Sequence, residues 1–314
     1  MTSYGRRRAG RPAALGQDHD IAGLLAWDAG GPLPADSLNR ALAHPRLGEA
    51  SRALARNMLE TAADGIFKDA GRYVAAAWAA HLHGSGELTM SRLKEASVSS
   101  GYLSRGRARD LLHYLLHLGF IQVIEPAGAW TPARYALTDD FTVIWRNHLA
   151  AALRAVCIME PAAGLLLDRL GEPAAFAAFA RFQSGGLLEL STKVTQQDAY
   201  TRVFLHRHAG FQVVWTLLAA GEDDFPSREP IPVSVAALAR RFGVSRVHIK
   251  RMFDEAKVEG LVSWEAPGAI RLLEPLRTTI RWYYAAQMLA LLIAVARTVK
   301  ALPELATTDA PRSA

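Results

Sequence analysis

Residues 234–268 read SVAALARRFGVSRVHIKRMFDEAKVEGLVSWEAPG, and this stretch decides the fold class that the sequence predicts. Val235–Phe242 has the spacing of small and apolar residues that a short helix requires, and Gly243 supplies the turn after it. Ser245 is a favourable N-cap for the next helix, because its hydroxyl can accept a hydrogen bond from a free backbone N–H group. The stretch therefore predicts two helices joined by a tight turn.

The second of these helices has two unlike faces. Its apolar residues recur at i, i+3, i+4 and i+7 and predict a buried stripe of Ile249, Met252, Phe253 and Ala256. The opposite face is centred on Val247 and Arg251 and carries cations towards its N-terminal half. Such a helix suits the major groove of DNA, where Arg reaches guanine O6 and N7 while Lys and Ser meet phosphates.

Two short runs of β-branched and aromatic residues, broken by Pro and Gly, interrupt the helical pattern. Leu261–Leu273 predicts a β-hairpin with a tight Pro267-Gly268 tip, and Phe120–Thr138 predicts a hairpin with a long tip around Pro126–Pro132. Each hairpin is followed by a long aromatic-bearing helix, namely Leu276–Val299 and Phe141–Met159.

The chain contains an internal repeat, because a shift of 141 residues aligns these two regions. Ser104-Arg105 then falls on Ser245-Arg246, and a helix with a Trp precedes each pair of helices. In the first copy the predicted buried stripe is Ala108, Leu111, Leu112 and Leu115. Its outer face is equally basic and carries Arg105, Arg107, Arg109 and, in addition, Asp110.

This order of elements resembles the winged helix-turn-helix fold of bacterial transcription regulators, broadly of the MarR type. The resemblance lies in SRLKEASVSSGYLSRGRARDLLHYLLHLGFIQVIEP, residues 91–126, and in the stretch quoted first. It implies a mainly α chain with two small β-hairpin wings, arranged as tandem winged helix-turn-helix domains in a pseudo-dimer. The helices at about 104–118 and 245–259 would then lie in the major groove of double-stranded DNA, with the wings on the backbone.

Carried over residue by residue, the resemblance implies that DNA is contacted by Ser104, Arg105, Arg107, Arg109 and wing Arg134, and by Ser245, Arg246, His248, Lys250, Arg251 and wing Arg271. The chain departs from the family pattern in two ways. MarR-type proteins usually carry one such unit and pair two chains, and Asp110 here occupies the position that corresponds to Arg251.

The distribution of charge supports a nucleic-acid partner without using the resemblance. The net charge is +6, from 36 Lys and Arg against 30 Asp and Glu. Residues 88–137 hold six basic and three acidic residues, and residues 231–272 hold seven and four. The two predicted units therefore account for the whole net charge, whereas an Arg-rich composition alone would spread it along the chain.

The remaining segments complete the predicted organisation. Residues 1–20 form a flexible basic arm, in which Arg6–Arg8 and Arg11 are a minor-groove arm or a solubilising tail. The first unit with its preceding helices takes 21–149, a helical connector takes 150–204 with a break at Gly185-Gly186, the second unit takes 205–302, and 303–314 is a tail. The region from 150 to 210 either lines an effector pocket or belongs to the core.

Several other interpretations compete with DNA binding. A winged-helix protein-interaction or scaffold module is the alternative, since a fold does not determine a function. His113 and His117 are four residues apart but have no further metal ligand at a familiar spacing, and Cys157 lies in an apolar helix. We find no catalytic or phosphate-binding motif, so we expect no enzyme, no cofactor and no metal.

The sequence also predicts where the protein works. A single Cys and the lack of a secretory signal indicate the cytoplasm, where DNA binding would associate the protein with the nucleoid. Trp282–Ala296 is shorter than the roughly twenty apolar residues that a membrane span needs, so we expect a buried or interface helix. Its aromatic stripe, Trp282–Tyr284, is typical of a core or dimer interface, and a homodimer and a small-molecule effector both stay open.

Overall fold

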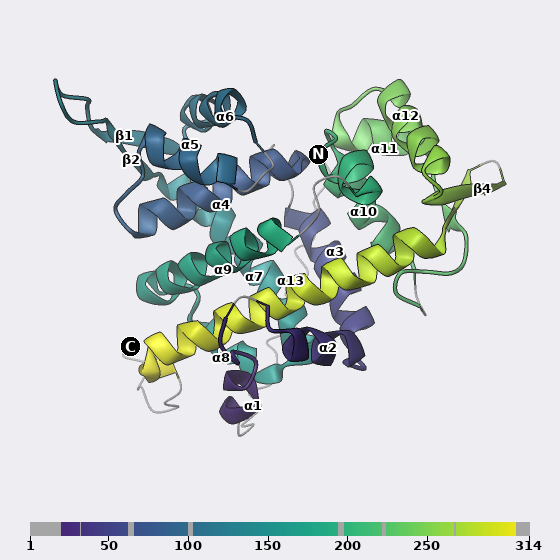
Figure 1. Ribbon diagram of the computed structural model, residues 1–314, viewed down its shortest axis with the longest axis horizontal. Helices are drawn as coiled ribbons and strands as arrows, with labels where there is room; N and C mark the ends of the chain where they lie inside the picture. Colours follow the sequence, from purple (N-terminus) through teal and green to yellow (C-terminus); the bar gives the residue numbers. More distant parts are fainter. Residues whose placement is uncertain are drawn as a thin grey trace, which may run out of the picture.

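The protein is mainly helical, with two small antiparallel sheets (Figure 1). The computed structural model describes residues 20–31, 33–61, 66–99, 103–193, 198–221, 224–266 and 268–305. The coarse fold class predicted from the sequence is therefore confirmed. The predicted basic arm, apart from Asp20, lies outside the described residues, as do Pro267 and residues 306–314 of the predicted tail.

The chain begins with three helices that pack against later parts of the protein. These are α1 (Ile21–Leu25), α2 (Ala35–Ala43) and α3 (Leu47–Thr61). The helices α1 and α2 lie on the last helix of the chain, and α3 packs against α7 and α10. The N-terminal part of the chain is thus part of the common core.

The first predicted unit forms a continuous series of elements. After η1 (Ile66–Lys68) come α4 (Ala70–Gly84), α5 (Met90–Ser99), α6 (Arg105–His117), β1 (Ile121–Glu125), β2 (Arg134–Leu137) and α7 (Asp139–Met159). The strands β1 and β2 pair antiparallel with Ile121 opposite Leu137. A bridge between Thr89 and Arg134 places the segment before α5 beside β2.

The second predicted unit repeats this order. It comprises α10 (Gly210–Ala219), β3 (Ile231–Pro232), α11 (Val235–Phe242), α12 (Arg246–Val258), β4 (Val262–Ala266), β5 (Ala269–Leu272) and α13 (Glu274–Ala301). Its strands are ordered β3-β5-β4. The pairing of β3 with β5 corresponds to the bridge between Thr89 and β2 in the first unit. The helices α6 and α12 begin at Arg105 and Arg246, at the 141-residue offset of the sequence repeat.

The connector between the units is helical but has no break at Gly185-Gly186. It comprises η2 (Pro161–Ala163), α8 (Gly164–Arg169), α9 (Pro173–Lys193) and η3 (Thr201–Leu205). The prediction of a break was wrong, because α9 packs along α13 and this burial outweighs the roughly 1 kcal/mol by which a glycine disfavours a helix. A Cβ on Gly186 would lie 3.5 Å from Ala290 of α13, so the two helices meet closely at this point.

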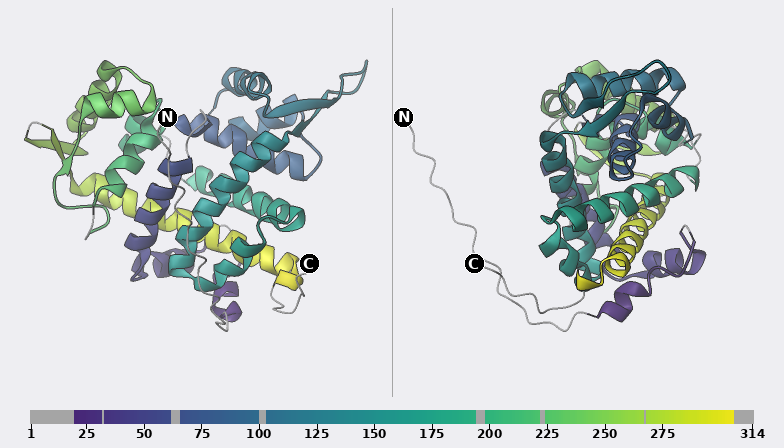
Figure 2. Two further views of the ribbon diagram at one scale, coloured as in Figure 1. Left: turned by 180° about the vertical axis from the view of Figure 1, so that it is seen from behind. Right: turned by 90° about the vertical axis from the view of Figure 1, so that its left-hand side faces the viewer.

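The helix α13 runs through the centre of the molecule and ends on the opposite side from its hairpin (Figures 1 and 2). It is long and apolar enough to cross a membrane, but 72% of its apolar window is buried inside the protein. This burial confirms the prediction of a core helix. The two long helices α7 and α13 touch, but the main partner of α13 is α9 and that of α7 is α3.

One hydrophobic cluster extends from Leu24 to Leu305 and joins all parts of the described chain. The predicted boundary between 149 and 150 falls inside α7, and that between 204 and 205 falls inside η3. The predicted tail also begins in the core, because η4 (Pro303–Leu305) buries Leu305. The two repeated units therefore share a single core.

A polar cluster is buried inside this core. The Tyr73 hydroxyl lies 3.0 Å from His148 Nε2, and the Gln183 amide donates to the same hydroxyl over 3.4 Å. Phe67 stacks on the His148 ring with a centroid distance of 4.5 Å. Burial lowers the pKa of His148 to about 3, so the imidazole is neutral at physiological pH.

The stability of the core can be tested at Leu292, which is fully buried in α13. Leu292→Ala removes apolar contacts and leaves a cavity, so we expect the free energy of unfolding to fall by about 2–5 kcal/mol. The control Val258→Ala changes a side chain that is 86% exposed and should alter stability by less than about 0.5 kcal/mol. Urea unfolding followed by circular dichroism measures both, and equal effects would contradict the assignment of α13 to the core.

The buried His148 makes stability depend on pH. An unfolded His takes up a proton below its usual pKa of about 6.5, whereas the folded protein excludes that proton down to about pH 3. The contribution is fully present above pH 6.5 and declines by up to about 1.4 kcal/mol for each pH unit below it. In unfolding experiments at pH 7.5, 6 and 5, wild type should lose more stability than His148→Phe, while the exposed-site control His113→Phe should follow wild type.

Candidate nucleic-acid interface

The helices α6 and α12 begin in the same way. The Ser104 hydroxyl accepts a hydrogen bond from the Arg107 backbone N–H over 3.3 Å, and the Ser245 hydroxyl accepts one from that of His248 over 3.1 Å. Both serines have extended backbone angles, as N-cap residues usually do. The predicted caps are confirmed, and each satisfies one backbone N–H of the first turn of its helix.

The buried stripes of both helices are also confirmed. Each of the eight side chains predicted to be buried is at most 4% exposed: Ala108, Leu111, Leu112 and Leu115 of α6, and Ile249, Met252, Phe253 and Ala256 of α12. The helix α12 packs against α11, and α6 packs against α5 and also against α4, where Ala108 and Leu111 cluster with Ala75. Between α11 and α12, Gly243 adopts a φ of 64°, which is the left-handed conformation that the tight turn requires. The outer face of each helix is thereby held in a defined direction.

On α6, the predicted contact residues are exposed and differ in their pairing. Arg105 and Arg107 form no ion pair with any residue that the structure describes. The guanidinium of Arg109 lies 3.6 Å from the carboxylate of Asp110, and both side chains are more than half exposed. Asp110 therefore offsets the charge of its neighbour, and the unpaired cations lie in the first turn.

On α12, the same division recurs. Arg246 and Arg251 are exposed and have no ion-pair partner within the described part of the chain. Lys250 is paired with Asp254 over 2.6 Å on the helix surface. Val247 lies between the two arginines and is 57% exposed, as its place at the centre of the outer face predicts.

His248 differs from the other predicted contact residues. Its side chain is half-buried, and Nε2 lies 2.8 Å from the backbone oxygen of His208, in the segment before α10. The imidazole is thus directed along the side of α12 towards the protein. The resemblance implied that His248 contacts DNA, and its contact with a residue 40 positions away has no signal in the sequence.

Two acidic residues at the C-terminal end of α12 are paired with arginines that precede α10. Glu255 pairs with Arg207, and the C-cap residue Glu259 lies 2.5 Å from Arg202 of η3. Because both carboxylates are bound to arginines, their charge is compensated before any ligand arrives. Nothing in the sequence of either segment marks these partners.

Both predicted wing arginines are anchored to the protein. Arg134 of β2 lies 2.7 Å from Glu125 of β1 and donates to the backbone oxygen of Gly86 over 3.2 Å. Arg271 of β5 lies 3.1 Å from Glu265 of β4 and donates to the backbone oxygen of Arg228 over 2.7 Å. These contacts brace the hairpins against the segments that precede α5 and α11.

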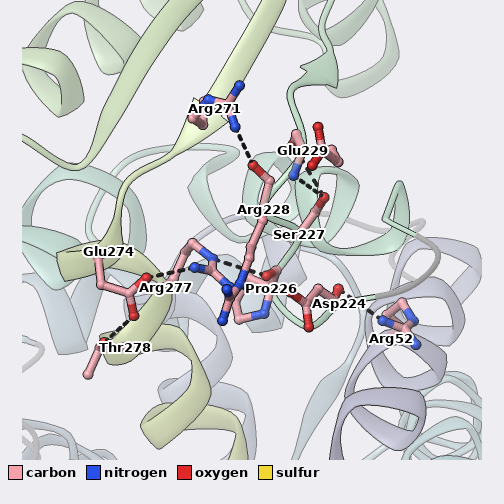
Figure 3. Close-up of polar contacts among 10 residues, drawn as sticks. All are labelled: Arg52, Asp224, Pro226, Ser227, Arg228, Glu229, Arg271, Glu274, Arg277 and Thr278. Atoms are coloured by element: carbon pink, nitrogen blue, oxygen red, sulfur yellow. Dashed lines mark hydrogen bonds and ion pairs between the residues drawn. The ribbon is translucent and has the colours of Figure 1, made fainter.

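The segment before β3 connects the second hairpin to the core, as Figure 3 shows. Arg277 of α13 is 12% exposed, donates to the backbone oxygen of Pro226 over 3.2 Å and pairs with Glu274 over 2.6 Å. Arg52 of α3 donates to the backbone oxygen of Asp224 over 3.0 Å. The position of the second hairpin therefore depends on the start of α13 and on α3.

The helices α6 and α12 lie at one edge of the molecule. In Figure 1, α6 and α12 both lie along the upper edge, and the two hairpins extend outwards at opposite ends. The tip of the first hairpin carries Trp130, which is 96% exposed, and Val123 and Ile124 of β1 are half exposed. This apolar tip was not singled out from the sequence, although the long loop between the predicted strands marks its place.

Other candidate groups in the described residues show no site. No cluster of three or more His, Cys, Asp and Glu side chains that could hold a metal ion occurs there. Cys157 is half-buried, and burial raises its thiol pKa to about 11, which disfavours the reactive thiolate. The arginines of residues 1–19 lie outside the described part of the chain.

The cap of α12 can be tested separately from any ligand. Ser245→Ala removes the acceptor for the His248 N–H, so the free energy of unfolding should fall by about 0.5–2 kcal/mol. Ser245→Gly should cost only a few tenths of a kcal/mol, because Gly is tolerated at this position. Urea unfolding gives the loss, and amide hydrogen exchange should place it in the first turn of α12. Equal losses in both variants would argue against a cap.

Comparisons with protein-family models, with curated proteins and with solved structures found no match to this chain.

Proposed function

We propose that the protein is a sequence-specific DNA-binding transcriptional regulator, in which two winged helix-turn-helix units are joined in one chain as a pseudo-dimer. In this proposal α6 and α12 each enter the major groove of double-stranded DNA, and the hairpins are wings that contact the backbone. The repeated order of elements supports the fold assignment, because helix, short strand or bridge, helix pair, hairpin and long helix occur twice in the same sequence. Such a protein would work in the cytoplasm at the nucleoid.

One observation carries the proposal. The exposed arginines at the N-terminal ends of two equivalent helices, Arg105 and Arg107 on α6 and Arg246 on α12, lack ion-pair partners within the described residues, and so does Arg251 one turn further along α12. An arginine that is paired with a carboxylate must break this ion pair before it can bind DNA. The four unpaired arginines can bind an acceptor on DNA directly. Guanine O6 and N7 and phosphate oxygens are the acceptors that a groove offers.

Carboxylates near the two helices could repel DNA phosphates, but they are paired with cations. Glu255 would repel phosphate if it were free, but it is bound to Arg207. Asp254 and Asp110 each have a cation beside them on the same helix. The surplus of positive charge is thereby concentrated at the edge where the two helices lie.

In this proposal the two wing arginines hold the hairpins in position and do not read bases. Arg134 and Arg271 are each bound by a carboxylate and a backbone oxygen, so their guanidinium groups have fewer donors left for DNA than those of Arg107 or Arg251. We expect the wings to contribute phosphate contacts, with specificity residing in the helices.

An interaction module is the second candidate, and the exposed apolar hairpin tip favours it. Trp130 is the kind of anchor that protein interfaces use. Selection of bound sequences from a random DNA pool at stated salt separates the two functions. A selected consensus with unlike half-sites, bound by one chain as judged from the molar mass of the complex, supports DNA reading; no consensus supports the module.

The consensus DNA can then be used to test individual side chains. Arg107→Ala and Arg251→Ala should each weaken binding by about 1–3 kcal/mol and relax specificity at one base pair, because each removes a bidentate contact. Lys250→Ala should weaken all sequences alike but reduce the salt slope by less than about one, because a phosphate contact by Lys250 competes with its ion pair to Asp254.

The matched control is Arg46→Ala. Arg46 is also a half-exposed arginine, but it pairs with Glu49 at the start of α3. It should leave affinity and specificity unchanged in fluorescence anisotropy titrations at several salt concentrations. If Arg107→Ala and Arg251→Ala bound the consensus as wild type does, the proposed orientation of both helices would be wrong.

A further inference from the structure

A cavity of about 60 Å³ lies at the junction of the two repeated units. On this measure one water needs about 10–15 Å³, so the cavity exceeds the size of an ordinary packing defect. Its wall includes Tyr73 and Ala77 of α4, Phe211 and Trp215 of α10, and Tyr284 of α13. The helices α4 and α10 precede the two helix pairs, so both units contribute to one cavity.

The wall is rich in aromatic side chains. Phe211 stacks on Trp215 with an interplanar angle of 7° and a centroid distance of 5.6 Å, and Tyr73 meets Phe211 edge to face at 6.2 Å. The side chains of Val74, Leu187 and Gln287, at the cavity wall, are only half-buried. The cavity is therefore not fully enclosed, and an occupant larger than the enclosed space can extend beyond it.

No residue that lines the cavity carries a formal charge at neutral pH. Its ionisable side chains are His148 and the tyrosines, and burial keeps His148 neutral by lowering its pKa to about 3. Burial also raises the pKa of Tyr73 and of Tyr284. An ion entering this space would lose its hydration without gaining a counter-charge, so the cavity favours a neutral occupant.

One polar group at the cavity has no partner. His148 is 3% exposed, and its Nδ1 makes no hydrogen bond to the described residues. The Tyr73 hydroxyl lies between the Gln183 amide, which donates to it, and His148 Nε2, whose role depends on the tautomer. In the tautomer that accepts the Tyr73 proton at Nε2, the imidazole proton is on Nδ1, where it is a buried donor without an acceptor. Buried donors are rarely left unsatisfied without a reason.

We propose that this cavity is a binding site for a small neutral aromatic molecule with one hydrogen-bond acceptor, whose ring packs among Tyr73, Phe211 and Trp215 and whose acceptor meets His148 Nδ1. The binding itself does not depend on the proposed DNA-binding function. If that function holds, an occupant that touches α4 and α10 biases how the two units are held, and so changes DNA affinity.

Three probes of similar size test the site in the full-length protein. Phenol supplies a ring and an acceptor, toluene supplies a ring of the same shape without the acceptor, and benzoate adds a charge. In calorimetric titrations we expect phenol to bind at least about tenfold more tightly than toluene, and benzoate to bind no better than toluene. Trp215 lies in the wall, so quenching of tryptophan fluorescence provides a second readout.

Two variants connect the binding to this cavity. Ala77→Leu fills the space, so it should abolish phenol binding without lowering the melting temperature. His148→Phe removes the donor, so it should reduce phenol affinity to that of toluene while leaving toluene binding intact. The control His113→Phe replaces an exposed histidine of α6 and should bind phenol as wild type does.

The outcomes separate this inference from the DNA-binding proposal. Failure of phenol to bind at millimolar concentration, equal binding of all three probes, or unchanged phenol binding in Ala77→Leu would overturn the inference, whatever the DNA selection shows. If His148→Phe does not fold, Ala77→Leu alone decides between binding in this cavity and binding elsewhere. Absence of a DNA consensus, with phenol bound as expected, would overturn only the DNA-binding function.

Discussion

The burial of α13 is the constraint on which the rest of the structure depends. From Tyr284 to Ala296 every residue of α13 except Gln287 is buried, because water would otherwise contact a large apolar surface. In this protein α9, α1 and α2 cover most of its length, and α3 and α7 also touch it. Since α13 starts directly after β5 and ends near η4, covering it joins the second hairpin to the opposite end of the molecule.

This arrangement explains why two similar units can hold α6 and α12 at one edge. The first turns of α6 and α12 are capped by serines, and the two helices pack against α5 and α11. The hairpins are braced by Arg134 and Arg271, and the second is linked through Arg277 to α13 itself. The exposed arginines therefore extend from a rigid support, which is what selective recognition of a ligand requires.

The local parts of the fold could be predicted because their causes lie within a few residues. The helix Val235–Phe242, the left-handed Gly243 and the caps Ser104 and Ser245 follow from short-range sterics and hydrogen bonding. The break expected at Gly185-Gly186 failed for the opposite reason, since the packing of α9 on α13 overrides a local preference. The inward contact of His248 and the arginine partners of Glu255 and Glu259 likewise arise between distant segments.

By itself the sequence determined the mainly helical class, the two hairpins, the 141-residue repeat and the concentration of positive charge in two segments, because periodicity, capping and charge counts depend only on neighbours along the chain. Only the tertiary structure decided which of those charges stay unpaired and which side chains enclose the aromatic cavity around His148. The physical reason is that ion pairs and cavities depend on distances between helices, and these distances are set by how the whole chain covers α13.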